Sequence, residues 1–147
     1  MSNEIVFDIE TIGDIANLET MEITVVSIYE YEHDKYTSFE RGELGKLWPI
    51  LEKATLLIGY NSEHFDIPIL NRYYPGDLLG FPSLDLLRVI KDSIGRRLRL
   101  NDVAEATLDI TKSADGLQAM RWWKEGKVDE IKKYCEQDVK VTKEVYE

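Results

Sequence analysis

Hydrophobic and polar positions change their spacing along the chain, from strand-like in the first part to helix-like beyond residue 60. Apolar residues alternate or form short β-rich runs in Glu4–Glu10, Ile23–Glu32 and Tyr36–Phe39, which predicts three strands. The residues His33–Lys35 separate the last two and predict a hairpin turn. A short apolar run, Thr55–Gly59, predicts a buried strand.

Helical spacing begins in Glu43–Lys53, although Pro49 within it predicts a break or a late helix start. Beyond Asn61 the apolar residues recur every three to four positions. The helices predicted there are Ile67–Tyr73, Leu84–Ile94, Leu100–Ala106, Gly116–Glu125 and Val128–Tyr146. The run Phe81–Leu84 predicts a short edge strand. This order predicts an α/β architecture with a mixed central sheet flanked by helices.

Length and composition favour one ordinary domain spanning residues 1–147. The chain has 147 residues and 44% hydrophobic content, enough for a core, and shows no repeat or low-complexity linker. Its apolar runs are far shorter than the roughly 20 residues of a membrane helix. Met1–Glu4 lacks the features of a secretory leader, so we expect a cytoplasmic protein. Because Cys135 is the single cysteine, an internal disulfide is excluded.

The charge balance is acidic, with 18 Lys and Arg against 28 Asp and Glu and a net charge of −10. Such a chain lacks the general electrostatic attraction of a simple nucleic-acid-binding module. The excess of acids is compatible with carboxylates that are gathered to bind divalent cations. A modest basic cluster at Arg96, Arg97 and Arg99, with Lys132 and Lys133, is either a set of phosphate contacts or a solvated surface.

The first candidate motif lies on the opening strand. Strand alternation places Ile5, Phe7 and Ile9 on one face, with Asp8 and Glu10 on the other, roughly 7 Å apart along the strand. Two acids on one face of a central strand destabilise a core unless cations or other partners compensate them. The alternative is an edge strand with a solvated face.

The second motif, Gly59–Leu70, leads from the buried strand through a polar turn into a helix that starts near Asp66. The turn follows the carboxyl end of a strand, where open α/β sheets commonly bind ligands. The alternative is that Asp66 is a plain helix N-cap, which leaves Gly59, Asn61 and Phe65 unexplained.

The third motif, Tyr134–Asp138, lies on the final predicted helix. Residues four apart share a helix face, so Tyr134 and Asp138 point together toward the core. The alternatives are a half-buried acid and a core aromatic with a solvated hydroxyl.

In their order, the three motifs resemble a known enzyme family. They read F-D-I-E-T (Phe7–Thr11), G-Y-N-x-x-x-F-D-x-P-x-L-x-x-R (Gly59–Arg72) and Y-C-x-x-D (Tyr134–Asp138). This pattern resembles the three exonuclease motifs of the DEDD superfamily. It is most similar to the tyrosine-containing (DEDDy) branch, as in the proofreading domain of B-family DNA polymerases and their stand-alone relatives. The resemblance implies a ribonuclease H-like fold.

The resemblance also implies a role for each motif residue. Two divalent cations, Mg²⁺ or Mn²⁺, are expected, and oxygen ligands suit both. Asp8 would bridge the two metals, Glu10 and Asp138 would complete the site of the nucleophilic water, and Asp66 would hold the second metal. Tyr134 would orient or help deprotonate that water. The substrate-binding residues implied are Thr11, Asn61 and Phe65, the last two lining the cleft for the 3′ end.

The function predicted is a metal-dependent 3′–5′ exonuclease. It would release nucleoside 5′-monophosphates from single-stranded ends, with DNA favoured over RNA, together with a replication, repair or RNA-processing partner. One alternative is a ribonuclease H-like endonuclease or resolvase. Another is a catalytically silent protein-interaction module. The pathway, the oligomeric state and the choice between Mg²⁺ and Mn²⁺ stay open.

Overall fold

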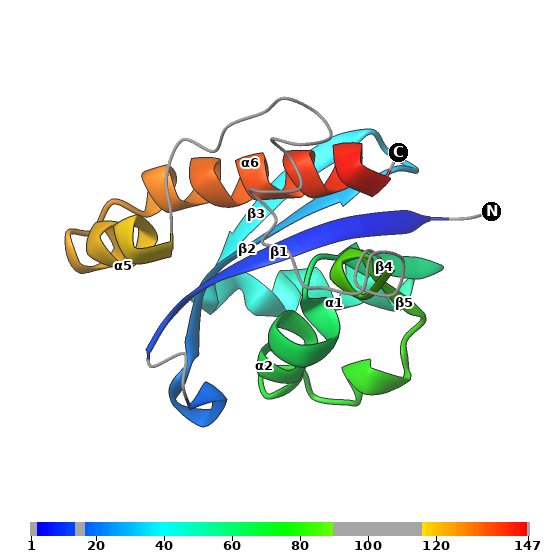
Figure 1. Ribbon diagram of the computed structural model, residues 1–147, viewed down its shortest axis with the longest axis horizontal. Helices are drawn as coiled ribbons and strands as arrows, with labels where there is room; N and C mark the ends of the chain where they lie inside the picture. The colour runs from blue at the N-terminus through cyan, green and yellow to red at the C-terminus, as the bar shows by residue number, and fades with distance from the viewer. Residues whose placement is uncertain (1–2, 14–16, 90–115, 147) are drawn as a thin grey trace.

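The computed structural model describes residues 3–13, 17–89 and 116–146, which form a five-stranded mixed sheet between helices (Figure 1). The strands are β1 (Glu4–Ile12), β2 (Glu22–Glu30), β3 (Lys35–Glu40), β4 (Leu56–Gly59) and β5 (Ser83–Asp85). Their order in the sheet is β3-β2-β1-β4-β5. The pairs β1–β2 and β2–β3 are antiparallel, whereas β1–β4 and β4–β5 are parallel. The predicted mixed sheet is confirmed, with β1 at its centre.

Helices cover both faces of the sheet (Figure 1). On one face lie α1 (Leu44–Glu52) and α2 (Ile67–Asn71), and on the other lie α5 (Gly116–Lys124) and α6 (Val128–Tyr146). The short helical segments are η1 (Leu18–Thr20), η2 (Arg41–Glu43), the π-helical turn η3 (Ser62–Asp66) and η4 (Leu78–Gly80). The bounds predicted for the last helix from its periodicity are those observed for α6.

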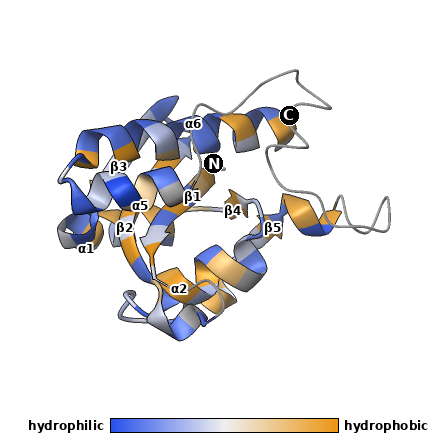
Figure 2. Cartoon of the chain, turned by 60° about the vertical axis from the view of Figure 1, so that its left-hand side comes forward, coloured by the Kyte–Doolittle hydropathy of each residue, from blue (hydrophilic) through white to orange (hydrophobic). Residues whose placement is uncertain are grey.

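The alternation along β1 sorts its side chains between two cores. Ile5, Phe7 and Ile9 join the core beneath α1 and α2, whereas Val6 packs with Val139 of α6 on the opposite face. Figure 2 shows hydrophobic strands behind the mainly hydrophilic outer faces of α5 and α6. Asp8 and Glu10, which share a face with Val6, are therefore directed toward the side that α6 covers.

Proline does not interrupt α1. The predicted break at Pro49 is wrong, because α1 runs through it from Leu44 to Glu52. Pro49 and Gly45, four residues earlier, are both exposed, so the Gly45 carbonyl that Pro49 cannot reach faces water. Buried Leu47 and Leu51 hold the helix on the core.

The hairpin and the later elements differ slightly from the sequence prediction. The turn occupies residues 31–34, with Asp34 at a positive φ of 48°, and Lys35 already belongs to β3. The start of the helix predicted over Leu84–Ile94 is occupied by β5, and helical structure begins at Leu86. The helix predicted over Leu100–Ala106 lies outside the described residues. Among the described helices, none has the length and apolar composition needed to cross a bilayer.

Close packing at the end of β4 generates a stability prediction. A Cβ on Gly59 would lie 2.7 Å from the Cβ of Ser62 and 3.1 Å from Cε1 of Phe7, both in the buried interior. We expect Gly59→Ala to lower the free energy of unfolding by about 1–3 kcal/mol, measured by urea denaturation.

The matched control is Gly45→Ala in α1, where an added Cβ meets nothing within 4 Å. This change should be neutral or stabilising by up to about 1 kcal/mol, since alanine favours a helix. Equal effects of the two substitutions would contradict the packing described at Gly59.

Candidate metal centre

The site is built where β1 extends beyond its parallel neighbour. β4 pairs with β1 only as far as the Val6–Ile58 register, and it ends at Gly59. β1 continues to Ile12, so its backbone beyond Val6 is not covered by β4. The chain that leaves β4 turns through η3 and brings Asp66 to this stretch, where the Ile9 amide donates a hydrogen bond to the Asp66 carboxylate. The first and second motifs therefore meet at one edge of the sheet.

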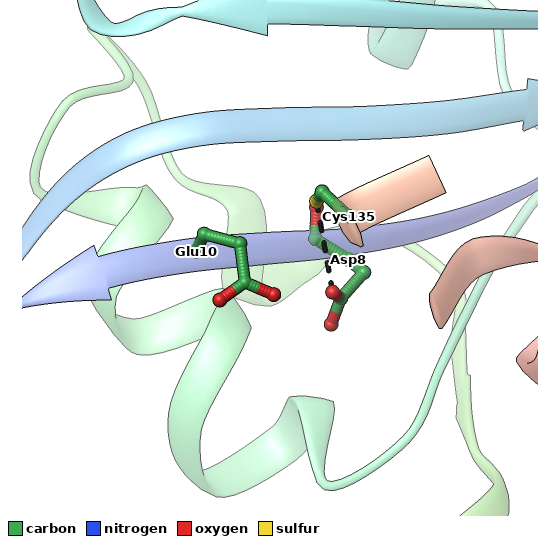
Figure 3. Close-up of side chains that lie close together, drawn as sticks. All are labelled: Asp8, Glu10 and Cys135. Carbon is green, nitrogen blue, oxygen red and sulfur yellow. Dashed lines mark hydrogen bonds between the residues drawn. The ribbon is translucent and has the colours of Figure 1, made fainter. Parts of the chain in front are cut away.

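Two acids of β1 lie close together beneath α6. Figure 3 shows Asp8 and Glu10 extending from the same strand, with Cys135 of α6 beside them. One ligand atom of each of these three side chains lies within 4.8 Å of the others. Glu10 is only 8% exposed, and Asp8 is half-buried. The alternative of a solvated edge strand is wrong, because β1 lies in the middle of the sheet.

Asp66 is buried and does not cap a helix. Its backbone is already helical, with φ −61° and ψ −51°, and its side chain accepts no capping hydrogen bond, so the N-cap alternative is wrong. Burial first, and then the negative charges of Asp85 and Asp138, raise the pKa of Asp66 to about 8, against the lowering effect of the Ile9 amide. Oδ2 of Asp66 is buried and accepts no hydrogen bond from any described residue.

The third motif comes from α6, which packs across β1 and β2. Tyr134 and Asp138, four residues apart, both face the sheet and are each 4% exposed. The charge of Asp138 raises the pKa of Asp66, which links the third motif with the second, and it also raises the pKa of the Cys135 thiol within the third motif. The ring of Tyr134 packs edge-on against Trp122 of α5, with centroids 6.2 Å apart.

The residues implied as substrate contacts occupy the borders of this acidic cluster. Thr11 is buried and follows a register shift between Glu10 and Thr11 in the β1–β2 pair. Asn61 is half-buried and has a left-handed backbone, with φ 59°. Phe65 is half-buried and packs against the core beneath α1 and α2. These three positions stay predictions as substrate contacts.

Sequence reasoning missed the role of two further residues. Cys135 is fully buried, and its thiol donates to the Asp8 carbonyl at 3.3 Å and to Asp8 Oδ2 at 3.6 Å. Burial and the charges of Asp8 and Glu10 raise the pKa of this thiol. Asp85, at the end of β5, is 3% exposed and accepts hydrogen bonds from three backbone amides. The signal available in the sequence was that Asp85 directly follows the strand predicted over Phe81–Leu84.

The acids present fit a hard divalent cation. Glu10, Asp66 and Asp138 are each less than one-tenth exposed, and burying several carboxylates together is costly without positive charge. Asp66 forms no ion pair with a described residue, and its buried Oδ2 is available as a ligand. Mg²⁺ and Mn²⁺ prefer such carboxylate oxygens. Asp8 and Glu10 are thus candidate ligands, whereas Asp66 and Asp138 do not belong to the group that lies within 4.8 Å and stay predicted ligands.

Comparison with known proteins identifies the superfamily and the fold. A protein-family model described as the RNase_H superfamily matches residues 5–147. The chain belongs to the RNase H superfamily. The structure of the family B DNA polymerase from the hyperthermophilic archaeon Pyrobaculum calidifontis matches 97% of this chain at 18% identity, with a TM-score of 0.77. At this identity the match shows a shared fold, and it spans only 24% of the polymerase chain. The search of curated proteins found no match. The predicted ribonuclease H-like fold is confirmed.

The basic residues of this RNase H superfamily chain are only partly described. Arg96, Arg97 and Arg99 lie outside the described residues. Lys132 pairs with Glu40 at 3.6 Å and with Glu43 at 3.9 Å, and Lys133 pairs with Glu130 at 3.9 Å. The two lysines are thus engaged by acids of the chain itself, and phosphate contact stays a prediction.

The pKa of Asp66 generates a prediction for the metal-free RNase H superfamily chain. The folded state keeps the Asp66 proton up to about pH 8, whereas the unfolded chain releases it near pH 3.8. The folded state therefore binds more protons across this window, and its stability falls as pH rises through it. We expect the melting temperature in chelator to decline from about pH 5 to about pH 9, and Asp66→Asn to flatten that decline.

The control for this pH series is Asp77→Asn, which changes an exposed acid that accepts a hydrogen bond from the Leu79 amide. The melting temperature of this control should decline with pH as that of the unaltered protein does. A decline of equal slope in Asp66→Asn would show that Asp66 is not the buried group that titrates.

Proposed function

We propose that the protein is a metal-dependent 3′–5′ exonuclease of the DEDDy type. It hydrolyses phosphodiester bonds at the 3′ ends of single-stranded nucleic acid and releases nucleoside 5′-monophosphates. Membership in the RNase H superfamily supports a nuclease-type function. The order and spacing of the three sequence motifs support the narrower assignment.

One observation carries the proposal: acids from three distant segments act either on one another or on a common neighbour, Cys135. Asp8 and Glu10 come from β1, Asp66 from η3 and Asp138 from α6. A fold stabilised only by apolar packing gains nothing from burying like charges together. A site that binds cations does gain, because each carboxylate contributes to their affinity.

The acids have complementary tasks in this proposal. When bound, two Mg²⁺ or Mn²⁺ ions supply positive charge against the phosphate, the attacking water and the leaving oxygen. Asp8 would serve both ions, Glu10 and Asp138 would hold the ion on the side of the water, and Asp66 would hold the other. The Cys135 thiol, which donates to Asp8, helps to fix the orientation of that carboxylate.

Tyr134 completes the site from α6. It faces the sheet on the same side of the helix as Asp138, and the edge of Trp122 restricts its ring. A hydroxyl held in this way orients the attacking water and accepts or passes on a proton. Thr11, Asn61 and Phe65 then position the terminal nucleotide, with the aromatic ring tolerant of any base.

DNA is the favoured substrate, because the structural neighbour is a DNA polymerase. This chain matches only 24% of that polymerase. Since the net charge of −10 attracts no nucleic acid by itself, delivery of the strand depends on a replication, repair or RNA-processing partner.

The central activity prediction uses single strands of DNA and RNA that carry a label at either end. With Mn²⁺, 3′-labelled strands should release labelled mononucleotide at once, whereas 5′-labelled strands should shorten stepwise, and chelator should stop both. Asp138→Asn should reduce kcat by at least roughly 10³-fold, because a ligand of the catalytic charge is lost.

The matched control for that loss is Asp77→Asn, which changes the exposed N-cap residue of η4, outside the proposed site. It should retain full activity. Internal fragments from both labels would instead indicate an endonuclease, and no cleavage of any strand with either metal would indicate a silent module.

Tyr134 gives a finer prediction. Tyr134→Phe removes only the hydroxyl and keeps the ring that packs on Trp122. We expect kcat to fall by roughly 10²-fold, with little change in KM, since positioned proton transfer contributes about that much. Since the metal ligands are unchanged, we expect Mn²⁺ to raise the melting temperature of Tyr134→Phe and of the unaltered protein equally. An unchanged kcat would remove Tyr134 from the mechanism.

A further inference from the structure

Asp85 is a buried carboxylate outside the three motifs. It ends β5, is 3% exposed and is the residue of that strand paired with Gly59, the last residue of β4. β4 and β5 are parallel, so their carboxyl ends open toward the same edge of the sheet as the turn that carries Asp66.

The carboxylate of Asp85 accepts three backbone amides from two segments. The Asn61 amide donates to Oδ1 at 2.8 Å, the Glu63 amide donates to Oδ2 at 3.1 Å, and the Leu87 amide donates to Oδ1 at 3.0 Å. Both oxygens are therefore engaged. Two of the three donors belong to the turn between β4 and α2, and the third belongs to the segment after β5.

The turn held in this way has an unusual backbone. Asn61 has a left-handed conformation with φ 59°, and residues 62–66 form a single π-helical turn, closed by a hydrogen bond from the Ile67 amide to the Ser62 carbonyl. Both features are uncommon, and each persists only where its surroundings enforce it. The Arg88–Glu63 ion pair, at 3.0 Å, adds a second link between the turn and the segment after β5.

Asp66 is the last residue of this turn. Its direction toward β1 depends on the path of the backbone from Asn61 onward, which the Asp85 carboxylate fixes. We propose that Asp85 is a positioning residue that holds the second-motif turn in its π-helical form and thereby aims Asp66 into the metal site. This inference rests on the proposed function for its catalytic consequence, whereas its structural part stands independently.

The contacts of Asp85 decide how it can act on the metal site. Since both Asp85 oxygens accept amides, Asp85 acts through Asp66 instead of replacing it as a ligand.

The test uses Asp85→Asn, which keeps the size of the side chain but places an NH₂ donor against one of the backbone amides. Mn²⁺ binding to the full chain should weaken by about 10- to 100-fold at the ion that depends on Asp66, as expected for loss of a supporting partner. The exposed acid Asp77, which accepts a single backbone amide, provides the control Asp77→Asn, with unchanged affinity.

A double-mutant cycle separates positioning from general destabilisation. If Asp85 acts through Asp66, then Asp66→Asn combined with Asp85→Asn should bind Mn²⁺ no more weakly than Asp66→Asn alone. Additive losses would overturn the proposal. The same cycle on kcat should show the same lack of additivity.

A measurement on the unaltered protein covers the case in which Asp85→Asn does not fold. Hydrogen exchange should show slow amides at Asn61, Glu63 and Leu87, and fast exchange at all three would overturn the proposal. These binding and exchange results do not require nuclease activity. If no strand is cleaved but the amides are slow and the Mn²⁺ cycle is non-additive, the proposed function fails and the role of Asp85 stands.

Discussion

Repulsion among buried carboxylates is the constraint around which this structure is organised. Glu10, Asp66 and Asp138 are each at least nine-tenths buried, and their charges act on one another or on common neighbours. Without cations this arrangement costs free energy, which the metal-free chain reduces by keeping a proton on Asp66 up to about pH 8. The buried acids therefore lower the free energy of unfolding of the metal-free chain, and binding of divalent cations would raise it again.

The topology explains how such distant residues meet. β1 extends beyond the end of β4, so the turn after β4 reaches a part of the β1 backbone that pairs with no parallel strand among the described residues. α6 packs on the other face of β1 and brings Cys135 into contact with Asp8, with Tyr134 and Asp138 buried on the same helix. β5 adds Asp85, whose three amide contacts hold the turn in place. The site therefore results from the different lengths of β1 and β4, from the turn that follows β4, and from the packing of α6 on β1.

Much of this arrangement follows from the sequence, because it rests on local periodicity. The alternation of β1 and the helical spacing of α6 place Asp8, Glu10, Tyr134 and Asp138 on the correct faces. Features that depend on tertiary contacts were not predictable. The Pro49 break fails because buried leucines hold α1, and the amides that Asp85 binds come from a turn more than 20 residues earlier. Local spacing carries no signal for such contacts.

The most direct test of a shared cation site is Mn²⁺ binding, followed by the electron paramagnetic resonance signal of free Mn²⁺ at about pH 8.5, above the pKa of Asp66. The account predicts two bound ions per chain and loss of one in Asp66→Asn. An unaltered chain that binds no Mn²⁺, or an Asp66→Asn variant that binds both ions as tightly as the unaltered chain, would contradict it.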